Sequence, residues 1–241
     1  MKECITPMAK GLFTVVETVT VIPDREKFHY IVVKLLYLGK RCRPDILPAV
    51  QFLCTRVMSP TVQDEAKLIR VLGYLKLTKQ WTRIFDSSPF ERVQTYIDVS
   101  FAMHSDGKSQ SACVVMLGNM LVHEACRKQK LITKSSTKVE LVALSDYISE
   151  GELIEHFLMD LGHLLDDDLV TNVHLVYQDN QSTIALVKNG GGKPRSKYMK
   201  MQQEYVKESL GTSELEVEYV RTLGVLADVL TKPIGGELYH S

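Results

Sequence analysis

The chain has 241 residues with 29 basic and 29 acidic side chains, so its formal net charge is zero. This balance argues against a strongly basic nucleic-acid binder, and no apolar run approaches the ~20 residues that a membrane span needs. The length suits one large or two small domains. Five cysteines without a CxxC pair indicate reduced thiols in an intracellular protein, not a disulfide framework or a zinc site.

The first third of the chain predicts a small helical region. Residues 1–28 are weakly patterned, and residues 28–38 are apolar enough for a buried helix or strand that Gly39 should end. Pro44 can open a second helix, because its missing N–H does no harm in a first turn. Apolar residues at helical spacing predict a third helix that ends near residue 79. Nothing in residues 29–85 suggests chemistry.

From about residue 85 the pattern changes to that of an α/β domain. Strands are expected at 93–101, 111–117, 121–125, 173–178 and 214–219. Helices are expected at 138–161, where Gly162 should end the helix, and at 180–189, 194–210 and 223–231. The order is β-β-β-α-β-α-α-β-α, and the crossover helix should place the fourth strand parallel to the first.

Two windows of this second part are basic although the whole chain is neutral. Residues 125–139 and 180–203 each contain five lysines or arginines and no acid. They could meet a phosphate backbone. Two solvated surface segments are the simpler interpretation, and it is favoured when the windows are considered alone.

Four carboxylates occupy positions where each has two interpretations. Asp98 lies in a strand, where Asp is depleted, unless it faces solvent. Glu140 heads the apolar stripe of the long helix and so should face the sheet, or else it complements the helix dipole. Asp179 follows a strand, where α/β sheets bind ligands, although Asp179 or Asn180 could cap the next helix. Asp228 lies in a short apolar helix, where it is unexpected unless it stands on the exposed, polar face of that helix.

The four carboxylates would form a functional site if the fold brings them close together. The first and fourth strands should be neighbours, which would place Asp98 beside Asp179, and the crossover helix can bring Glu140 over the same end. Such a cluster would repel itself without cations. Oxygen ligands without Cys or His fit Mg²⁺ or Mn²⁺ and not Zn²⁺. Two such ions ~4 Å apart are the usual arrangement for cutting phosphodiesters.

Five motifs resemble those of the copia-type retrotransposon polyprotein and stand in the same order. They are LLYLGKRCRPDIL at 35–47, YID at 96–98, KQK with SSTKVELVALS at 128–130 and 135–145, YQDNQS at 177–182, and LADVLTKP at 226–233. The element order, with Asp, Glu, Asp and Asp, is also similar to ribonuclease H. The resemblance covers about residues 28–238. It implies that residues 29–85 are a helical tail of the reverse transcriptase region. It also implies that residues 90–235 form a ribonuclease H-like mixed five-stranded sheet flanked by helices.

The resemblance also implies an activity and a site. Its catalytic, metal-binding set would be Asp98, Glu140, Asp179 and Asp228, which would hold two Mg²⁺ ions, or Mn²⁺, and hydrolyse the RNA strand of an RNA/DNA hybrid. Contacts to the nucleic acid are expected from Asn180, Gln181, Ser182, Lys193, Arg195 and Lys197. Other parts of a retroelement polyprotein are further expected partners, and no membrane is. No YxDD polymerase motif is present, so DNA synthesis is not expected.

The chain departs from the family pattern in three places, and the first is the segment after Asp98, where Phe101 stands near the position of the usual tryptophan. The Thr-Lys-His-Ile-Asp pattern of the family appears as Ser-Lys-Tyr-Met-Lys at 196–200, and the loop at 220–224 lacks the histidine of cellular ribonucleases H. These departures favour an alternative, a decayed copy that folds without cutting and acts at most as a nucleic-acid-binding or assembly module.

Overall fold

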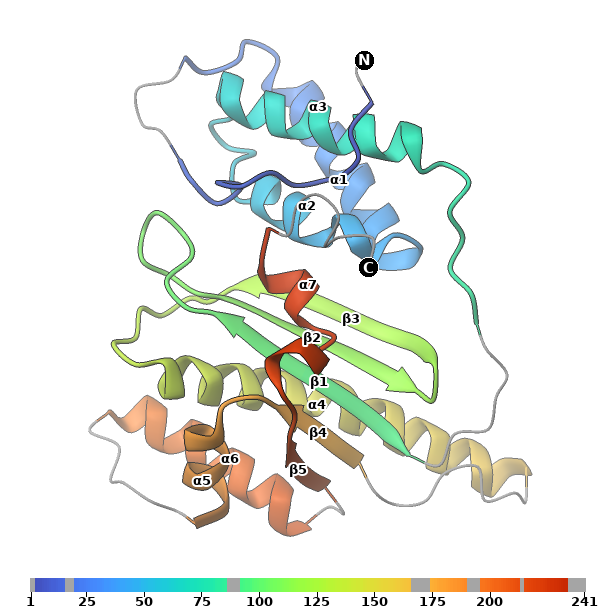
Figure 1. The fold of residues 1–241 in the computed structure, drawn as a ribbon, viewed down its shortest axis with the longest axis vertical. Coiled ribbons are helices and arrows are strands. Elements are labelled where there is room, and N and C mark those ends of the chain that lie inside the picture. Colours follow the sequence, from blue (N-terminus) through green and yellow to red (C-terminus); the bar gives the residue numbers. More distant parts are fainter. Residues whose placement is uncertain are drawn as a thin grey trace.

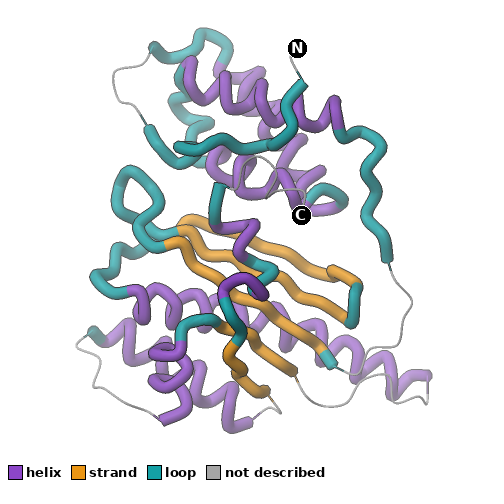
Figure 2. Tube along the Cα trace, viewed as in Figure 1, coloured by secondary structure: helices purple, strands orange, loops and turns teal. Residues whose placement is uncertain are grey.

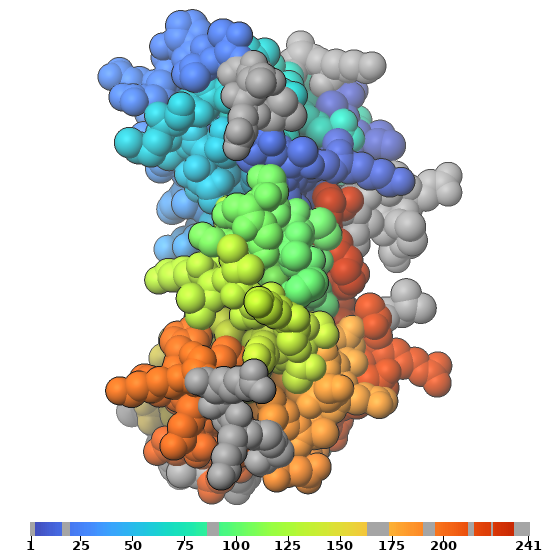
Figure 3. Space-filling view, turned by 90° about the vertical axis from the view of Figure 1, so that its left-hand side faces the viewer, coloured from blue at the N-terminus to red at the C-terminus, as the bar shows by residue number. Residues whose placement is uncertain are grey.

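The computed structural model describes residues 3–15, 20–85, 92–165, 174–189, 196–212 and 215–233. The molecule is elongated, with the N-terminal helices at one end, a sheet in the middle and further helices at the other end (Figure 1). Figure 3 shows the same order from the side, with N-terminal residues (blue) at the top, residues near 100–130 (green) in the middle and residues near 180–210 (orange) at the bottom. Within the described ranges, no helix is both long and apolar enough to cross a membrane.

The N-terminal third forms the expected helices, which we call the helical unit. They are α1 (Arg25–Arg41), α2 (Leu47–Cys54) and α3 (Val62–Leu77), with a 3₁₀ turn at Pro44–Ile46 before α2. The prediction that Gly39 ends the first helix is wrong, since α1 continues to Arg41. A Cβ atom on Gly39 would lie 2.9 Å from Leu47 Cδ2, so this glycine permits close packing of α1 on the start of α2.

The weakly patterned N-terminal segment contributes to the core of the helical unit. Met8, Leu12 and Phe13 are buried in one cluster with residues of α1, α2 and α3. In addition, the Phe13 ring lies 4.6 Å, between centroids, from His104 in the connection between the first two strands. The helical unit and the sheet are therefore packed together, not joined only by the chain.

The second part forms the predicted mixed five-stranded sheet. Its strands are β1 (Val93–Ser100), β2 (Gln110–Leu117), β3 (Met120–Lys128), β4 (His174–Gln178) and β5 (Leu215–Tyr219), in the spatial order β3-β2-β1-β4-β5. As expected, β1 pairs antiparallel with β2 and parallel with β4. The sheet and its element order confirm the predicted α/β architecture, a mixed five-stranded sheet flanked by helices.

The helices of this part differ from the prediction at their ends. They are α4 (Ser136–Leu165), α5 (Gln181–Asn189), α6 (Lys197–Thr212) and α7 (Asp228–Thr231). Gly162 does not end α4, contrary to expectation. The final helix is also shorter than predicted, because residues 222–224 form a separate 3₁₀ turn and α7 begins only at Asp228.

The two faces of the sheet are covered by different elements (Figure 2). On one face Ile97, Val99 and Cys113 pack in a cluster with buried residues of α4, α5 and α6. On the other face Ala112 and Cys126 join residues of α7 and of the helical unit. Because side chains alternate along a strand, Asp98 points to the α7 face.

A close contact holds α4 on the sheet at Gly151. The buried His174 ring of β4 lies against Gly151, and His174 Nε2 is 2.7 Å from Thr95 Oγ1 of β1. Burial lowers the pKa of His174 to about 4, so the ring is neutral at pH 7. This contact sets the height of α4 above β1 and β4, the strands that carry Asp98 and precede Asp179.

Candidate active site

Asp98 is buried on β1, with 3% of its surface exposed. Thr231 Oγ1, at the end of α7, donates a hydrogen bond to Asp98 Oδ2. Burial raises the pKa of Asp98, and the charges of Asp228 and Asp179 add to this effect, while Thr231 and Lys232 oppose it. Asp98 is therefore not on a solvent-facing side of the strand, and its negative charge is unfavourable where it stands.

Glu140 lies in the first turns of α4 and faces the sheet, as the apolar stripe predicts. It is 6% exposed, and Gln178 Nε2 of β4 donates to its Oε2 at 3.2 Å. Burial, together with the charges of Asp98 and Asp179, raises the pKa of Glu140 to about 9. In the absence of a cation this carboxyl group is protonated at pH 7.

The stretch after β4 resolves which residue caps α5. Asn180 is the cap, since its Oδ1 accepts a hydrogen bond from the Thr183 amide at 3.1 Å. Asp179 is half-buried and accepts from Thr222 Oγ1 at 2.8 Å. Gln178 Oε1 accepts from the amides of both Asp179 and Asn180, at 2.8 and 3.2 Å, and so fixes this turn. The Asp179 carboxylate is thus not needed for capping.

Asp228 is the first residue of α7 and is half-buried. Its carboxylate forms an ion pair with Lys232, one turn later. Although burial lowers the pKa of Lys232, its hydrogen bond with Asp228 and the charges of Asp98 and Asp179 raise it overall. Lys232 was not among the predicted site residues. Its spacing of four from Asp228, in the LADVLTKP motif, was the available signal.

The structure brings the four carboxylates into one electrostatic neighbourhood near the carboxyl ends of β1 and β4. Asp98 is affected by Asp179 and Asp228, and Glu140 by Asp98 and Asp179. Within the described ranges, no three acidic, His or Cys side chains are close enough to hold a metal ion as they stand. Thr231 and Lys232 engage two of the carboxylates instead, and like charges keep apart without a cation. The all-oxygen donor set fits Mg²⁺ or Mn²⁺, but the metal-binding role of these residues stays a prediction.

The predicted nucleic-acid contacts are placed in part. Gln181 and Ser182 are exposed at the start of α5, Asn180 is half-buried and Lys197 is exposed at the start of α6. Lys193 and Arg195 lie outside the described residues. Gln181 and Ser182 follow Asp179 closely in the sequence and are exposed to solvent, and the nucleic-acid-binding role of all six residues stays a prediction.

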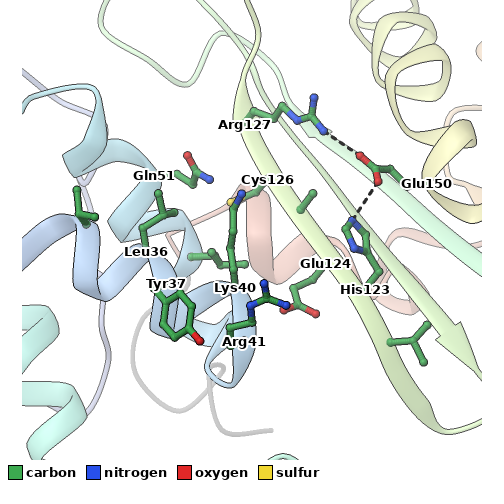
Figure 4. A pocket seen from close by; sticks show the side chains of 14 residues that line it. Leu36, Tyr37, Lys40, Arg41, Gln51, His123, Glu124, Cys126, Arg127 and Glu150 are labelled. Carbon is green, nitrogen blue, oxygen red and sulfur yellow. Dashed lines mark hydrogen bonds and ion pairs between the residues drawn. The ribbon is translucent and has the colours of Figure 1, made fainter. Parts of the chain in front are cut away.

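A groove of about 700 Å³ lies away from this cluster, between α1 and β3 (Figure 4). None of the four carboxylates lines it. In the groove the Glu150 carboxylate forms an ion pair with Arg127 at 3.1 Å and lies 3.5 Å from His123 Nε2, and burial lowers the pKa of His123. The groove marks where the helical unit meets the edge of the sheet, and it is not part of the candidate active site.

Sequence comparisons place the chain among transposon proteins. No protein-family model matches it. It is 30% identical, over 97% of its length, to the retrovirus-related Pol polyprotein from transposon RE2 of Arabidopsis thaliana. The corresponding protein from transposon RE1 is 29% identical over the whole chain. The chain is homologous to the Pol polyproteins of copia-type transposons. The chain spans 16% of the length of the RE1 and RE2 polyproteins.

Structural comparison agrees with the fold. The foamy viral protease-reverse transcriptase in complex with double-stranded DNA matches 89% of the chain, which covers 34% of that protein. The TM-score is 0.50 at 9% identity, which supports the fold alone. RNase H1 from Halobacterium salinarum matches 58% of the chain and is itself matched over 93% of its length, with 15% identity and a TM-score of 0.40.

Proposed function

We propose that the chain is a metal-dependent endonuclease that hydrolyses the RNA strand of RNA/DNA hybrids. The observation that carries this proposal is the cluster of acidic side chains from β1, α4, α7 and the end of β4. A carboxylate cluster repels a polyphosphate ligand unless cations lie between them. Burial disfavours the charged forms of Asp98 and Glu140, and a bound cation would favour them. In a cation-dependent phosphodiesterase, each of these acidic side chains would bind the cations.

The surrounding residues would set the geometry of this site. Bound Mg²⁺ or Mn²⁺ would supply charge neutralisation and Lewis acidity at the phosphate. The side-chain amide of Gln178 makes two contacts: its Nε2 orients the Glu140 carboxyl group, and its Oε1 orients the backbone of Asp179. Thr231 orients Asp98. Gln181 and Ser182 would reach the hybrid's backbone or its 2′-hydroxyl groups, the feature that distinguishes RNA from DNA.

Substrate choice is tested with a panel of four end-labelled nucleic acids of one sequence. They are an RNA/DNA hybrid, an RNA duplex, a DNA duplex and the single-stranded RNA. In Mg²⁺ we expect cleavage of the RNA strand in the hybrid only. Equal cleavage of the DNA duplex would contradict the proposed substrate.

Lys232 should compete with metal ions for the carboxylates. Its ammonium group neutralises Asp228 when no metal is bound and would repel a divalent cation nearby. We expect Lys232→Met to bind Mn²⁺ more tightly than the unsubstituted chain, measured by calorimetry or from the electron paramagnetic resonance of free Mn²⁺. Lys188→Met, on the exposed side of α5, is the control and should leave the affinity unchanged. Weaker binding by Lys232→Met would mean that the lysine supports the metal site.

A second candidate function is a binding or assembly module without turnover. The altered segment at 196–200 favours it, because Tyr198 and Lys200 stand where the family pattern has His and Asp. Such a module would bind the hybrid with similar affinity in the unsubstituted chain and in Asp98→Asn. Neither form would cleave it in Mg²⁺ or Mn²⁺.

A further inference from the structure

The four-residue helix α7 cannot hold its own position. An isolated helix of this length is unstable in water, and the residue before it, Ala227, makes no side-chain capping hydrogen bond. Yet α7 carries Asp228, and its last residue, Thr231, donates to Asp98. The location of both groups therefore depends on what packs around α7.

The packing around α7 comes from two directions. Below it lie Ala112 and Val114 of β2 and Cys126 of β3, and above it lies α2 of the helical unit (Figure 1). Leu47, the first residue of α2, is 1% exposed and shares one buried cluster with Ala227 and Leu230. These two residues flank Asp228 in the sequence.

Leu47 is itself held by the helical unit. The backbone of α1 at Gly39 approaches it so closely that even a Cβ atom would be 2.9 Å from Leu47 Cδ2. Leu36 of α1 packs against the same cluster and lines the groove beside it (Figure 4). A continuous apolar contact thus runs from α1 through Leu47 to α7.

We propose that Leu47 is a positioning residue for the carboxylate cluster, through which the helical unit holds α7, and with it Asp228 and Thr231, against the sheet. The inference rests on the proposed function for its catalytic meaning, although the positioning itself does not. It makes the segment attributed to the reverse transcriptase region a structural part of the nuclease site.

The test compares two leucine-to-alanine substitutions on the same helix in the full chain. Leu47→Ala removes the contact with α7. Leu53→Ala is the matched control, since Leu53 is also fully buried but belongs to the core of the helical unit. Leu47→Met keeps the volume and is the rescue variant. All three are studied at a temperature where circular dichroism shows that each is folded.

The first readout is amide hydrogen exchange over residues 225–232. Exchange takes place in metal-free buffer and is measured by mass spectrometry. The amides of Asp228, Leu230 and Lys232 are hydrogen-bonded within this segment, and the amide of Val225 donates to the Thr222 carbonyl just before it, so all four report its opening. We expect faster exchange there in Leu47→Ala, and exchange like that of the unsubstituted chain in Leu53→Ala and Leu47→Met. Equal exchange in the two alanine variants would overturn the proposal.

The second readout is Mn²⁺ affinity. A loss of roughly 10-fold or more is expected for Leu47→Ala, as for other residues that orient metal ligands, with little change in Leu53→Ala. Equal affinities in the two alanine variants would overturn the role in the site. If the unsubstituted chain binds no Mn²⁺ while exchange behaves as expected, the proposed function fails and the positioning of α7 by Leu47 stands.

Discussion

Replacing Asp98 by asparagine is expected to abolish hydrolysis of the hybrid and to leave the fold intact. The amide keeps the shape of the side chain and can accept the hydrogen bond from Thr231. It cannot, however, share the charge of a divalent cation. The loss of several kcal/mol of transition-state stabilisation corresponds to a fall in rate of about 10³-fold or more. Initial rates of cleavage in Mg²⁺ measure it.

The stability of Asp98→Asn separates loss of chemistry from loss of structure. Because burial raises the pKa of Asp98, the folded state favours the neutral form of this side chain. A neutral amide should therefore not lower the thermal midpoint in metal-free buffer. Asp106→Asn, in an exposed loop where Asp106 pairs with Lys128 at 2.8 Å, is the matched control and should keep the rate. A folded Asp98→Asn that cleaves within about tenfold of the normal rate would show that Asp98 is not a metal ligand.

The second large effect is expected from Gly151→Ala, and it concerns stability. A Cβ atom at position 151 would lie 2.3 Å from the His174 ring and 2.4 Å from Thr95 Oγ1. These side chains are buried and bonded to each other, so α4 would have to move away from the sheet. Overpacking of this kind costs about 3 kcal/mol of the free energy of unfolding, against a helix-propensity gain for alanine of about 1 kcal/mol. Urea denaturation measures the net loss.

Gly211→Ala provides the control for this prediction. Gly211 lies in α6, and a Cβ atom there would meet nothing within 4 Å. Only the propensity gain remains, so we expect a stability that is unchanged or up to about 1 kcal/mol higher. If Gly151→Ala were as stable as Gly211→Ala, the close contact between α4 and His174 would not exist in solution.

The order of elements could be predicted because each segment carries its own periodicity. The alternation of Glu216 and Glu218 with Val217 matches the exposed and buried sides of β5. The ends of the helices were harder to predict. A glycine can either end a helix or permit close packing, and the local sequence does not distinguish these two roles. Gly39 is the example, because the contact that requires it is with Leu47 of the next helix.

The candidate site could be predicted only as a set of acids. The parallel pairing of β1 with β4 follows from the crossover helix, and so does the approach of Asp98 to Asp179. The groups that hold these acids depend on packing between distant segments. Thr231, for example, is 133 residues from Asp98. Likewise, Asp179 and Asn180 are both good caps, and only the structure shows that Asn180 takes this role.

The most direct test of the account is cleavage of a labelled RNA/DNA hybrid by the unsubstituted chain, with and without divalent metal. The account predicts that the RNA strand is cut when Mg²⁺ or Mn²⁺ is added and remains intact in a chelator. A chain that is folded by circular dichroism and binds the hybrid, but cuts nothing in either metal, would contradict it and favour the decayed copy.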